Sequence, residues 1–383
     1  MASVDGSSSD PHINFGRHDT LMEKKIFNFH PGPAILPHEV MLKAQAEFAN
    51  FRGIGYGLME ESHRSPVFMD VIKQAETNIR ELMGISDNYA VLFLQGGASL
   101  QFAMVPMNIG IPGKPMLYAD TGYWASRAIK EAKLFGDVKL VYEGKKSNYS
   151  HIGDPHDWSF DPDAAYAFVC SNNTIYGSQY HFFPETGALP LVADMSSDIM
   201  SRPVDMNKFA IIFAGAQKNL GPSGVTLAIV RKDLMARCPA NIPTMLKYST
   251  HIENDSMYNT PPTFGIYIIA LVTEWIKEQG GLEGMNRLNT AKSNALYNAI
   301  DNSAGYFRGT VDPGDRSKMN VTFRLPSEEL EGKFCKEATA ASLIGLKGHR
   351  AVGGVRASIY NAMPLEGVER LVDFMHSFQA ANG

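Results

Sequence analysis

Short, unbroken apolar runs recur along the chain and are separated by segments whose apolar residues fall on one helical face. The runs lie at residues 89–94, 115–119, 166–170, 189–193, 209–214 and 225–230, and residues 138–142, which include Lys139, predict a further strand. Apolar runs without polar alternation are typical of strands buried on both faces of a parallel sheet. The repeated order of strand, loop and helix therefore predicts an α/β fold, with a mostly parallel central sheet flanked by helices and joined by right-handed crossovers.

The pattern changes after residue 230. Residues 241–262 are polar and irregular, and we expect no regular structure there. Beyond them the sequence predicts helices, one alternating strand and a final helix at 263–279, 282–300, 320–324, 327–343 and 364–380. This part indicates a smaller C-terminal α+β domain.

We therefore expect a large α/β domain over residues 26–285 and a small domain over 286–383. Residues 1–25 are rich in serine and aspartate, contain no long apolar run, and are expected to form a disordered tail rather than a secretory signal.

Composition narrows the classes of partner. The apolar fraction of 44% and the charged fraction of 20% are typical of a globular protein, and a net charge of -5 gives no reason to expect nucleic acid or an anionic membrane. No apolar run approaches the roughly 20 residues that span a bilayer. The three cysteines are scattered and form no Cys-x-x-Cys pair, which predicts neither disulfides nor a zinc site and fits the cytoplasm.

One lysine stands out by its position. Lys218 follows the apolar run 209–214 and precedes a Gly-Pro-Ser-Gly turn. The carboxyl ends of strands in α/β sheets are where ligands bind, and a lysine desolvated there has a lowered pKa and a nucleophilic amine. On this stretch alone, a solvated surface lysine is the commoner interpretation.

An acid supports the functional interpretation of Lys218. Asp194 ends the run at 189–193, 24 residues upstream. If the two runs are parallel neighbours, both side chains emerge at the same edge of the sheet. Pyridoxal 5'-phosphate requires this pair, because a lysine binds its aldehyde and a carboxylate pairs with its pyridinium nitrogen.

Other segments offer places for an anion or a ring. Gly96 and Gly97 separate a strand from a helical pattern beginning near Leu100, an arrangement that directs backbone N–H groups at a phosphate, and His63-Arg64 precedes another helix. Neither Gly-x-Gly-x-x-Gly nor a Walker sequence occurs, which argues against dinucleotides and nucleoside triphosphates. Taken alone, the glycine pair is more often just a turn, and His63-Arg64 is equally typical of a solvated loop. Trp124, at a strand-to-helix junction, can lay its face on a planar ring but is equally typical of ordinary packing.

Several longer motifs occur together and in a fixed order. They are FNFHPGPAILP, SHRS, LQGGAS, GYW, NNTIYG, VADMSS, AGAQKNLGPSG, YNTPPTF and GHRAVGGVRASIYNAMPLEGV. From about Phe27 to its end, the chain resembles the phosphoserine aminotransferase family, whose members are class V, fold type I pyridoxal-phosphate enzymes. The resemblance implies amino transfer from L-glutamate to 3-phosphohydroxypyruvate, giving O-phospho-L-serine and 2-oxoglutarate in serine biosynthesis.

The same resemblance implies roles for individual residues. Lys218 would carry the covalent link to the cofactor, Asp194 would pair with its ring nitrogen, and Trp124 would stack on the ring. The phenolic oxygen would be bonded by Thr174. The cofactor phosphate would be held by Ala98, Ser99 and Gln217, joined by Asn259 and Thr260 from the second subunit of a homodimer. Some family members have arginine at the position of Ser99, so the grip here would depend on backbone groups and a hydroxyl.

For the substrate, the resemblance implies that Arg356 binds the α-carboxylate. The phosphate of the substrate, or the side-chain carboxylate of glutamate, would be held by His349 and Arg350 together with the partner subunit's His63 and Arg64. Recurrence of the His-Arg pair suits a phosphate dianion, because arginine bonds it in bidentate fashion and histidine changes charge near neutral pH.

Three other functions stay open from the sequence. A cysteine desulfurase needs a reactive thiol on a mobile loop, and none of the cysteines lies in a Gly/Ser-rich loop. An alanine- or serine-type aminotransferase would not need two His-Arg pairs. A non-catalytic α/β protein that binds anions would be colourless when purified and would not transfer amino groups.

Overall fold

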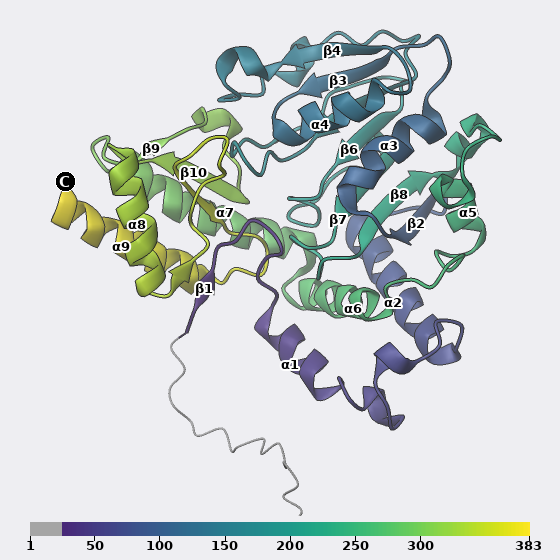
Figure 1. The fold of residues 1–383 in the computed structure, drawn as a ribbon, viewed down its shortest axis with the longest axis horizontal. Coiled ribbons are helices and arrows are strands. Elements are labelled where there is room, and N and C mark those ends of the chain that lie inside the picture. The colour runs from purple at the N-terminus through teal and green to yellow at the C-terminus, as the bar shows by residue number, and fades with distance from the viewer. Residues whose placement is uncertain (1–24) are drawn as a thin grey trace, which may run out of the picture.

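The central feature of the fold is a seven-stranded sheet with the order β2-β8-β7-β6-β5-β3-β4 (Figure 1). The computed structural model describes residues 25–383. The strands are β2 (Tyr89–Leu94), β3 (Met116–Asp120), β4 (Val138–Glu143), β5 (Tyr166–Cys170), β6 (Leu191–Asp194), β7 (Ile211–Gly215) and β8 (Thr226–Arg231). Strand β8 pairs antiparallel with both of its neighbours, β2 and β7, whereas the pairs from β7 through β4 are parallel. The predicted α/β fold with a mostly parallel sheet is therefore confirmed.

Helices cover both faces of this sheet because successive strand residues point to opposite sides. On one face, Val91 and Phe93 pack in a cluster with α2 (Pro66–Met83) and α6 (Thr263–Glu278), against which α1 (His38–Ala46) also packs. On the other face, Leu92 and Leu94 pack with α3 (Gly97–Ile109) and α4 (Tyr123–Ala132). The strands from β2 to β3 in the order of the sheet are thus buried on both sides, as their apolar runs predicted, whereas the edge strand β4 is half-buried or exposed.

The C-terminal part forms a smaller unit beside the sheet (Figure 1). Its elements are α7 (Gly281–Asp301), β9 (Arg308–Gly309), β10 (Asn320–Arg324), α8 (Glu328–Ala340), β11 (Leu343–Ile344), β12 (Val355–Ser358) and α9 (Leu365–Asn382). Strands β12, β10 and β9 form an antiparallel sheet, and a third hydrophobic cluster fills the space between it and the helices. An α+β arrangement was expected from the change in pattern.

Two features bear on the predicted division into residues 26–285 and 286–383. Helix α7 runs through the predicted boundary without a break. The short strand β1 (Phe27–Asn28) pairs in parallel with β11, and Phe27 and Phe29 pack in the C-terminal cluster. The first described residues therefore contribute to the C-terminal unit, while the division itself stays a prediction.

Two local predictions were wrong. The helix expected from Leu100 begins at Gly97, because Gly96 takes the left-handed conformation (φ 88°) and turns the chain directly into the helix. Part of the stretch expected to be irregular forms α5 (Tyr248–Glu253). Tertiary contacts override the weak local pattern there: the Tyr248 N–H donates to Asn108 Oδ1 (3.0 Å), and its hydroxyl donates to Gln101 Oε1 (2.7 Å).

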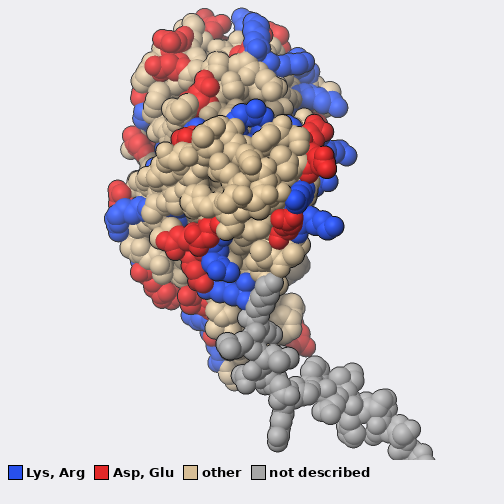
Figure 2. Space-filling model, turned by 90° about the vertical axis from the view of Figure 1, so that its left-hand side faces the viewer, with Lys and Arg blue, Asp and Glu red and all other residues tan. Residues whose placement is uncertain are grey.

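Almost all of the predicted N-terminal tail, residues 1–24, lies outside the described part of the chain. Within residues 25–383, no helix combines the length and apolar character needed to cross a membrane. On the face drawn in Figure 2, basic and acidic side chains are interspersed around a broad uncharged area. This face therefore offers no continuous strip of positive charge to a polyanion.

Candidate active site

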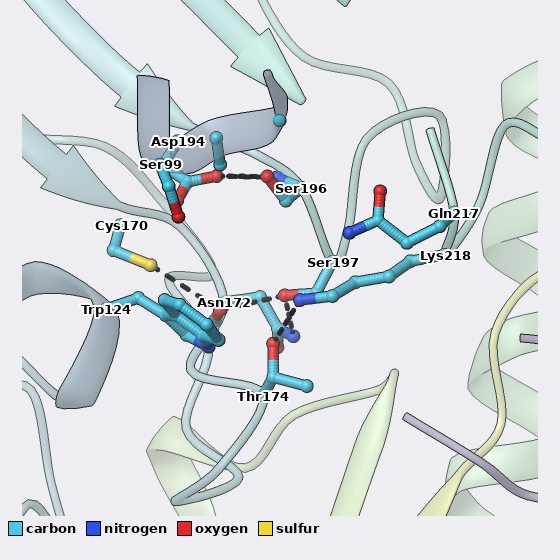
Figure 3. A pocket seen from close by; sticks show the side chains of 12 residues that line it. Ser99, Trp124, Cys170, Asn172, Thr174, Asp194, Ser196, Ser197, Gln217 and Lys218 are labelled. Atoms are coloured by element: carbon cyan, nitrogen blue, oxygen red, sulfur yellow. Dashed lines mark hydrogen bonds between the residues drawn. The ribbon is translucent and has the colours of Figure 1, made fainter. Parts of the chain in front are cut away.

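A pocket opens where the carboxyl ends of β5, β6 and β7 meet the N-termini of α3 and α4 (Figure 3). The residues that line it are Gly97, Ala98, Ser99, Trp124, Cys170, Asn172, Thr174, Asp194, Ser196, Ser197, Gln217 and Lys218. The strand-end position is where α/β sheets bind ligands.

Lys218 enters the pocket from the loop between β7 and β8. Its Nζ donates to Thr174 Oγ1 (2.8 Å) and lies 5.8 Å from the centroid of the Trp124 ring. Gly32 packs against the lysine stem, where a Cβ would approach Lys218 Cγ to 3.3 Å. Burial lowers the pKa of Lys218, and the nearby Asp194 carboxylate partly opposes this shift. The amine is therefore held in place and is more easily deprotonated than a surface lysine.

Asp194 stands at the end of β6, which pairs in parallel with β7 as the sequence predicted. Its side chain is buried, and Oδ1 accepts hydrogen bonds from Ser196 N (2.9 Å) and Ser196 Oγ (2.6 Å). Burial raises the pKa of Asp194, whereas the Ser196 donors and the Lys218 charge lower it. Among the described residues no donor reaches Oδ2, so this oxygen can accept a hydrogen bond from a ligand.

The N-terminus of α3 offers an anion-binding site, here called the α3 anion seat, at one side of the pocket. The bond from Leu100 N to Gly96 O (3.3 Å) is the first in the helix, so the N–H groups of Gly97, Ala98 and Ser99 have no helical acceptor. Together with the helix dipole, these groups favour a phosphate or carboxylate. Gln217 lines the same pocket.

The C-terminal unit delivers an arginine to the pocket. Arg356 lies on β12 with 6% exposure, and its Nη1 donates to the Thr174 carbonyl (3.1 Å). Its Nε is buried without a partner in residues 25–383. Burial lowers the pKa of Arg356, and its charge contributes to the lowered pKa of Lys218. A buried cation with an unused donor is suited to a carboxylate ligand.

His349 and Arg350 extend this positive charge. The His349 ring lies 5.5 Å from the ring of Tyr123, the residue before Trp124. Partial burial lowers the pKa of His349, as do the charges of Arg356 and Arg350. The group therefore sits beside the pocket in surroundings that attract an anion.

Seven residues singled out in the sequence are not among those that line this pocket within one chain: Arg356, His349 and Arg350, which lie beside it, and four others, His63, Arg64, Asn259 and Thr260. His63 and Arg64 precede α2, and Asn259 lines a separate cavity with Gln95 and Gly96. Thr260 contributes its carbonyl to a hydrogen bond from Gln95 Nε2 (3.3 Å). One chain alone does not bring these four to Lys218.

Other lining residues were not predicted as ligands. Ser196 and Ser197 lie two and three residues after Asp194, and Asn172 lies two residues after the end of β5. Asn172 Nδ2 donates to Ser197 Oγ (2.8 Å) and to Asn320 Oδ1 (2.8 Å), which links the pocket wall to β10. The available signal was a polar residue directly after a buried strand, a signal that many loops share.

The donor set fits pyridoxal 5'-phosphate. The free N–H groups at α3 suit its phosphate, the Trp124 ring can stack on its ring, and Asp194 Oδ2 can accept its pyridinium N–H. Lys218 supplies an amine at the same pocket. Each polar part of the cofactor thus has a matching group in the chain.

Comparisons with known proteins agree with this chemistry. The family model described as "Aminotransferase class-V" matches residues 26–371. A phosphoserine aminotransferase from Syntrophobacter fumaroxidans is 53% identical, covering 94% of this chain and 100% of its own. The solved phosphoserine aminotransferase from Bacillus circulans subsp. alkalophilus has a TM-score of 0.92 and 51% identity, covering 94% of this chain and 99% of its own.

A second solved structure shows the cofactor in a more distant relative. The pyridoxal-phosphate-bound phosphoserine aminotransferase from Trichomonas vaginalis has a TM-score of 0.84 and 37% identity, covering 92% of this chain and all of its own. Fold, pocket chemistry and near full-length similarity therefore coincide. The chain belongs to the class-V aminotransferases, which depend on pyridoxal phosphate, and within them to the phosphoserine aminotransferase family.

Proposed function

We propose that the chain catalyses reversible amino transfer from L-glutamate to 3-phosphohydroxypyruvate, giving O-phospho-L-serine and 2-oxoglutarate. The observation that carries the proposal is that Lys218 and Asp194 line one pocket, beside which Arg356 of the C-terminal unit donates to the carbonyl of Thr174, another lining residue. The unpaired state of Cys170, Cys238 and Cys335 supports a reducing compartment, and we place the activity in the cytoplasm.

The chain's own groups position and move the proton. Bound pyridoxal phosphate supplies an electron sink for negative charge at the substrate Cα. The Lys218 amine, with its pKa lowered by burial, can take the Cα proton as general base and return it as general acid. The Asp194 carboxylate favours positive charge on the atom that faces its Oδ2. The hydrogen bonds from Ser196 fix the orientation of this carboxylate.

Substrate recognition follows from the positive groups of the C-terminal unit. We assign the α-carboxylate to Arg356, whose buried fork has an unused Nε–H. The phosphate of phosphoserine, or the side-chain carboxylate of glutamate, is assigned to His349 and Arg350. Binding of a dianion there opposes the shift that lowers the His349 pKa and favours the imidazolium form.

This assignment predicts a specificity change. Arg350→Ala should lower kcat/KM for O-phosphoserine about 10- to 100-fold, because a charge-assisted bond to phosphate is lost. The rate with alanine and glyoxylate should hardly change. Steady-state kinetics with both substrate pairs measure the difference, and Lys347→Ala, an exposed neighbouring cation, is the matched control. Equal losses on both pairs would contradict the role of Arg350, and wild-type rates on alanine that match those on phosphoserine would contradict the substrate assignment.

The thiols argue against a desulfurase. Cys170 lines the pocket but is 3% exposed, and burial raises its pKa well above the usual value. Burial also raises the pKa of Cys335 to about 11. A nucleophilic cysteine needs the opposite shift.

We further propose a homodimer in which each active site takes residues from both chains. His63 Nε2 is buried without a hydrogen-bond partner in the described part of the chain, and Asn259 and Thr260 lie behind the α3 anion seat, beside Gln95. Large apolar side chains are exposed in the same regions, namely those of Met41, Leu42, Phe48, Tyr56, Met59, Met69, Met245 and Tyr258. Such exposure supports an interface. In the dimer, the partner subunit's Asn259 and Thr260 would join the cofactor phosphate, and the partner subunit's His63 and Arg64 the substrate.

Mixed dimers test this arrangement. Lys218→Ala and Arg64→Ala chains should each be nearly inactive alone, whereas random mixing should restore about a quarter of the wild-type rate. Half of the dimers would then be hybrids, each with one intact site. The measurement is the transamination rate of the unfractionated mixture after co-expression of two differently tagged chains; the isolated hybrid, with one of its two sites intact, should show about half of the wild-type rate. No recovery would contradict the placement of Arg64 in the partner's site.

A further inference from the structure

A lysine outside the pocket is buried without a counter-ion. Lys292 on α7 is 0% exposed, and no ion pair among the described residues includes it. Its Nζ donates instead to three main-chain carbonyls: those of Ile359 (2.9 Å), Tyr360 (2.7 Å) and Asn361 (3.4 Å). Burial lowers its pKa to about 7. Burying a charged group without a counter-ion costs desolvation free energy. The contacts of Lys292 therefore call for a functional explanation.

The three carbonyls belong to a segment, residues 359–361, that directly follows β12. Arg356 lies three residues before this segment on the same strand. At its other end, the Asn361 N–H donates to Asn219 Oδ1 (3.0 Å), and Asn219 is the residue after Lys218. The segment therefore lies between the two cations of the proposed active site.

A second side chain of α7 strengthens the same junction. Asn289, one turn before Lys292, donates from Nδ2 to Asn361 Oδ1 (2.8 Å) and to Ser201 O (3.1 Å). Asn361 Nδ2 donates in turn to Met200 O (2.9 Å) in the loop after β6. Figure 1 shows α7 leading from the end of α6 into the C-terminal unit, so the helix is anchored on both sides of this junction.

We propose that Lys292 is a positioning residue for the active site. Its ammonium group gathers the carbonyls of residues 359–361 and thereby fixes Arg356 and the Lys218 loop relative to each other. An ammonium group provides three donors for the three acceptors, which a neutral apolar side chain would leave unpaired. The inference depends on the proposed roles of Lys218 and Arg356.

Two substitutions of Lys292 distinguish a role in positioning residues 359–361 from a role in filling the buried space alone. Lys292→Met removes all three donors, and Lys292→Gln keeps two N–H donors without the charge. Lys318→Met is the matched control: Lys318 also bonds to α7, at Thr290 Oγ1 (2.9 Å) and Asn286 Oδ1 (3.3 Å), but does not bond to residues 359–361. For Lys292→Met we expect a loss of at least about tenfold in kcat/KM, with a raised KM for glutamate. Lys292→Gln should lose less and Lys318→Met little.

Amide hydrogen exchange of the purified holoenzyme gives a readout that needs no catalysis. Residues 355–361 and 216–220 should exchange faster in Lys292→Met than in Lys318→Met. Equal kinetic constants in the two variants would overturn the proposal, as would faster exchange without a kinetic change. If Lys292→Met does not fold, Lys292→Gln decides by the same two measurements. A wild-type chain that fails to transfer amino groups would contradict the proposed function, whereas the exchange comparison would still test the contact.

Discussion

Replacing Lys218 with alanine is expected to lower the rate of amino transfer at least about 10³-fold, because the pocket loses both its nucleophile and its general base. Among the described residues that line the pocket, Lys218 is the one lysine, and the nearby Arg356 is held at the Thr174 carbonyl and carries a delocalised charge, so it cannot replace the amine. The measurement is the single-turnover rate with phosphoserine, together with the visible spectrum of the purified protein.

Two controls make this result specific. Lys208→Ala removes a surface lysine that pairs with Glu185, and it should leave the rate unchanged. A small primary amine added to the Lys218→Ala protein should restore part of the proton transfer, since the vacated space lies inside the pocket. An active Lys218→Ala protein with the wild-type spectrum would overturn the assignment.

Asp194→Asn should lower kcat about 10²- to 10³-fold, since the pocket loses the negative charge that favours a protonated ring nitrogen. The Ser196 hydrogen bonds can persist at the amide oxygen, so the fold should survive. Ser196→Ala keeps the carboxylate and removes only its orienting hydroxyl, and the expected loss is about tenfold. Single-turnover rates of the three proteins measure this series. A series in which Ser196→Ala is more damaging than Asp194→Asn would contradict the role of the charge.

The chemistry-bearing pair could be predicted from sequence because its signals are local. Asp194 and Lys218 each follow a buried apolar run, and parallel strands place their carboxyl ends at one edge. The same rule found the glycines before α3. The first residue of that helix was predicted wrongly, because the positive φ of Gly96, which sets the start at Gly97, depends on the surrounding turn.

The remaining site residues carry no local signal. Arg356 sits in an ordinary alternating strand, and only the docking of β12 against the Thr174 loop brings it to Lys218. Lys292 lies in an amphipathic helix where its burial depends on carbonyls 67 to 69 residues away. The pairing of β1 with β11 likewise joins residues 27–28 to residues 343–344, which no short window of sequence can predict.

The central claim is a covalent link between Lys218 and the cofactor aldehyde in the pocket that Asp194 shares. Borohydride reduction of the purified protein, followed by digestion and mass spectrometry, tests it most directly. We predict loss of the visible absorption band and a pyridoxyl mass increment on the peptide that contains Lys218. An increment on a different lysine, or none on a protein that transfers amino groups, would contradict the account.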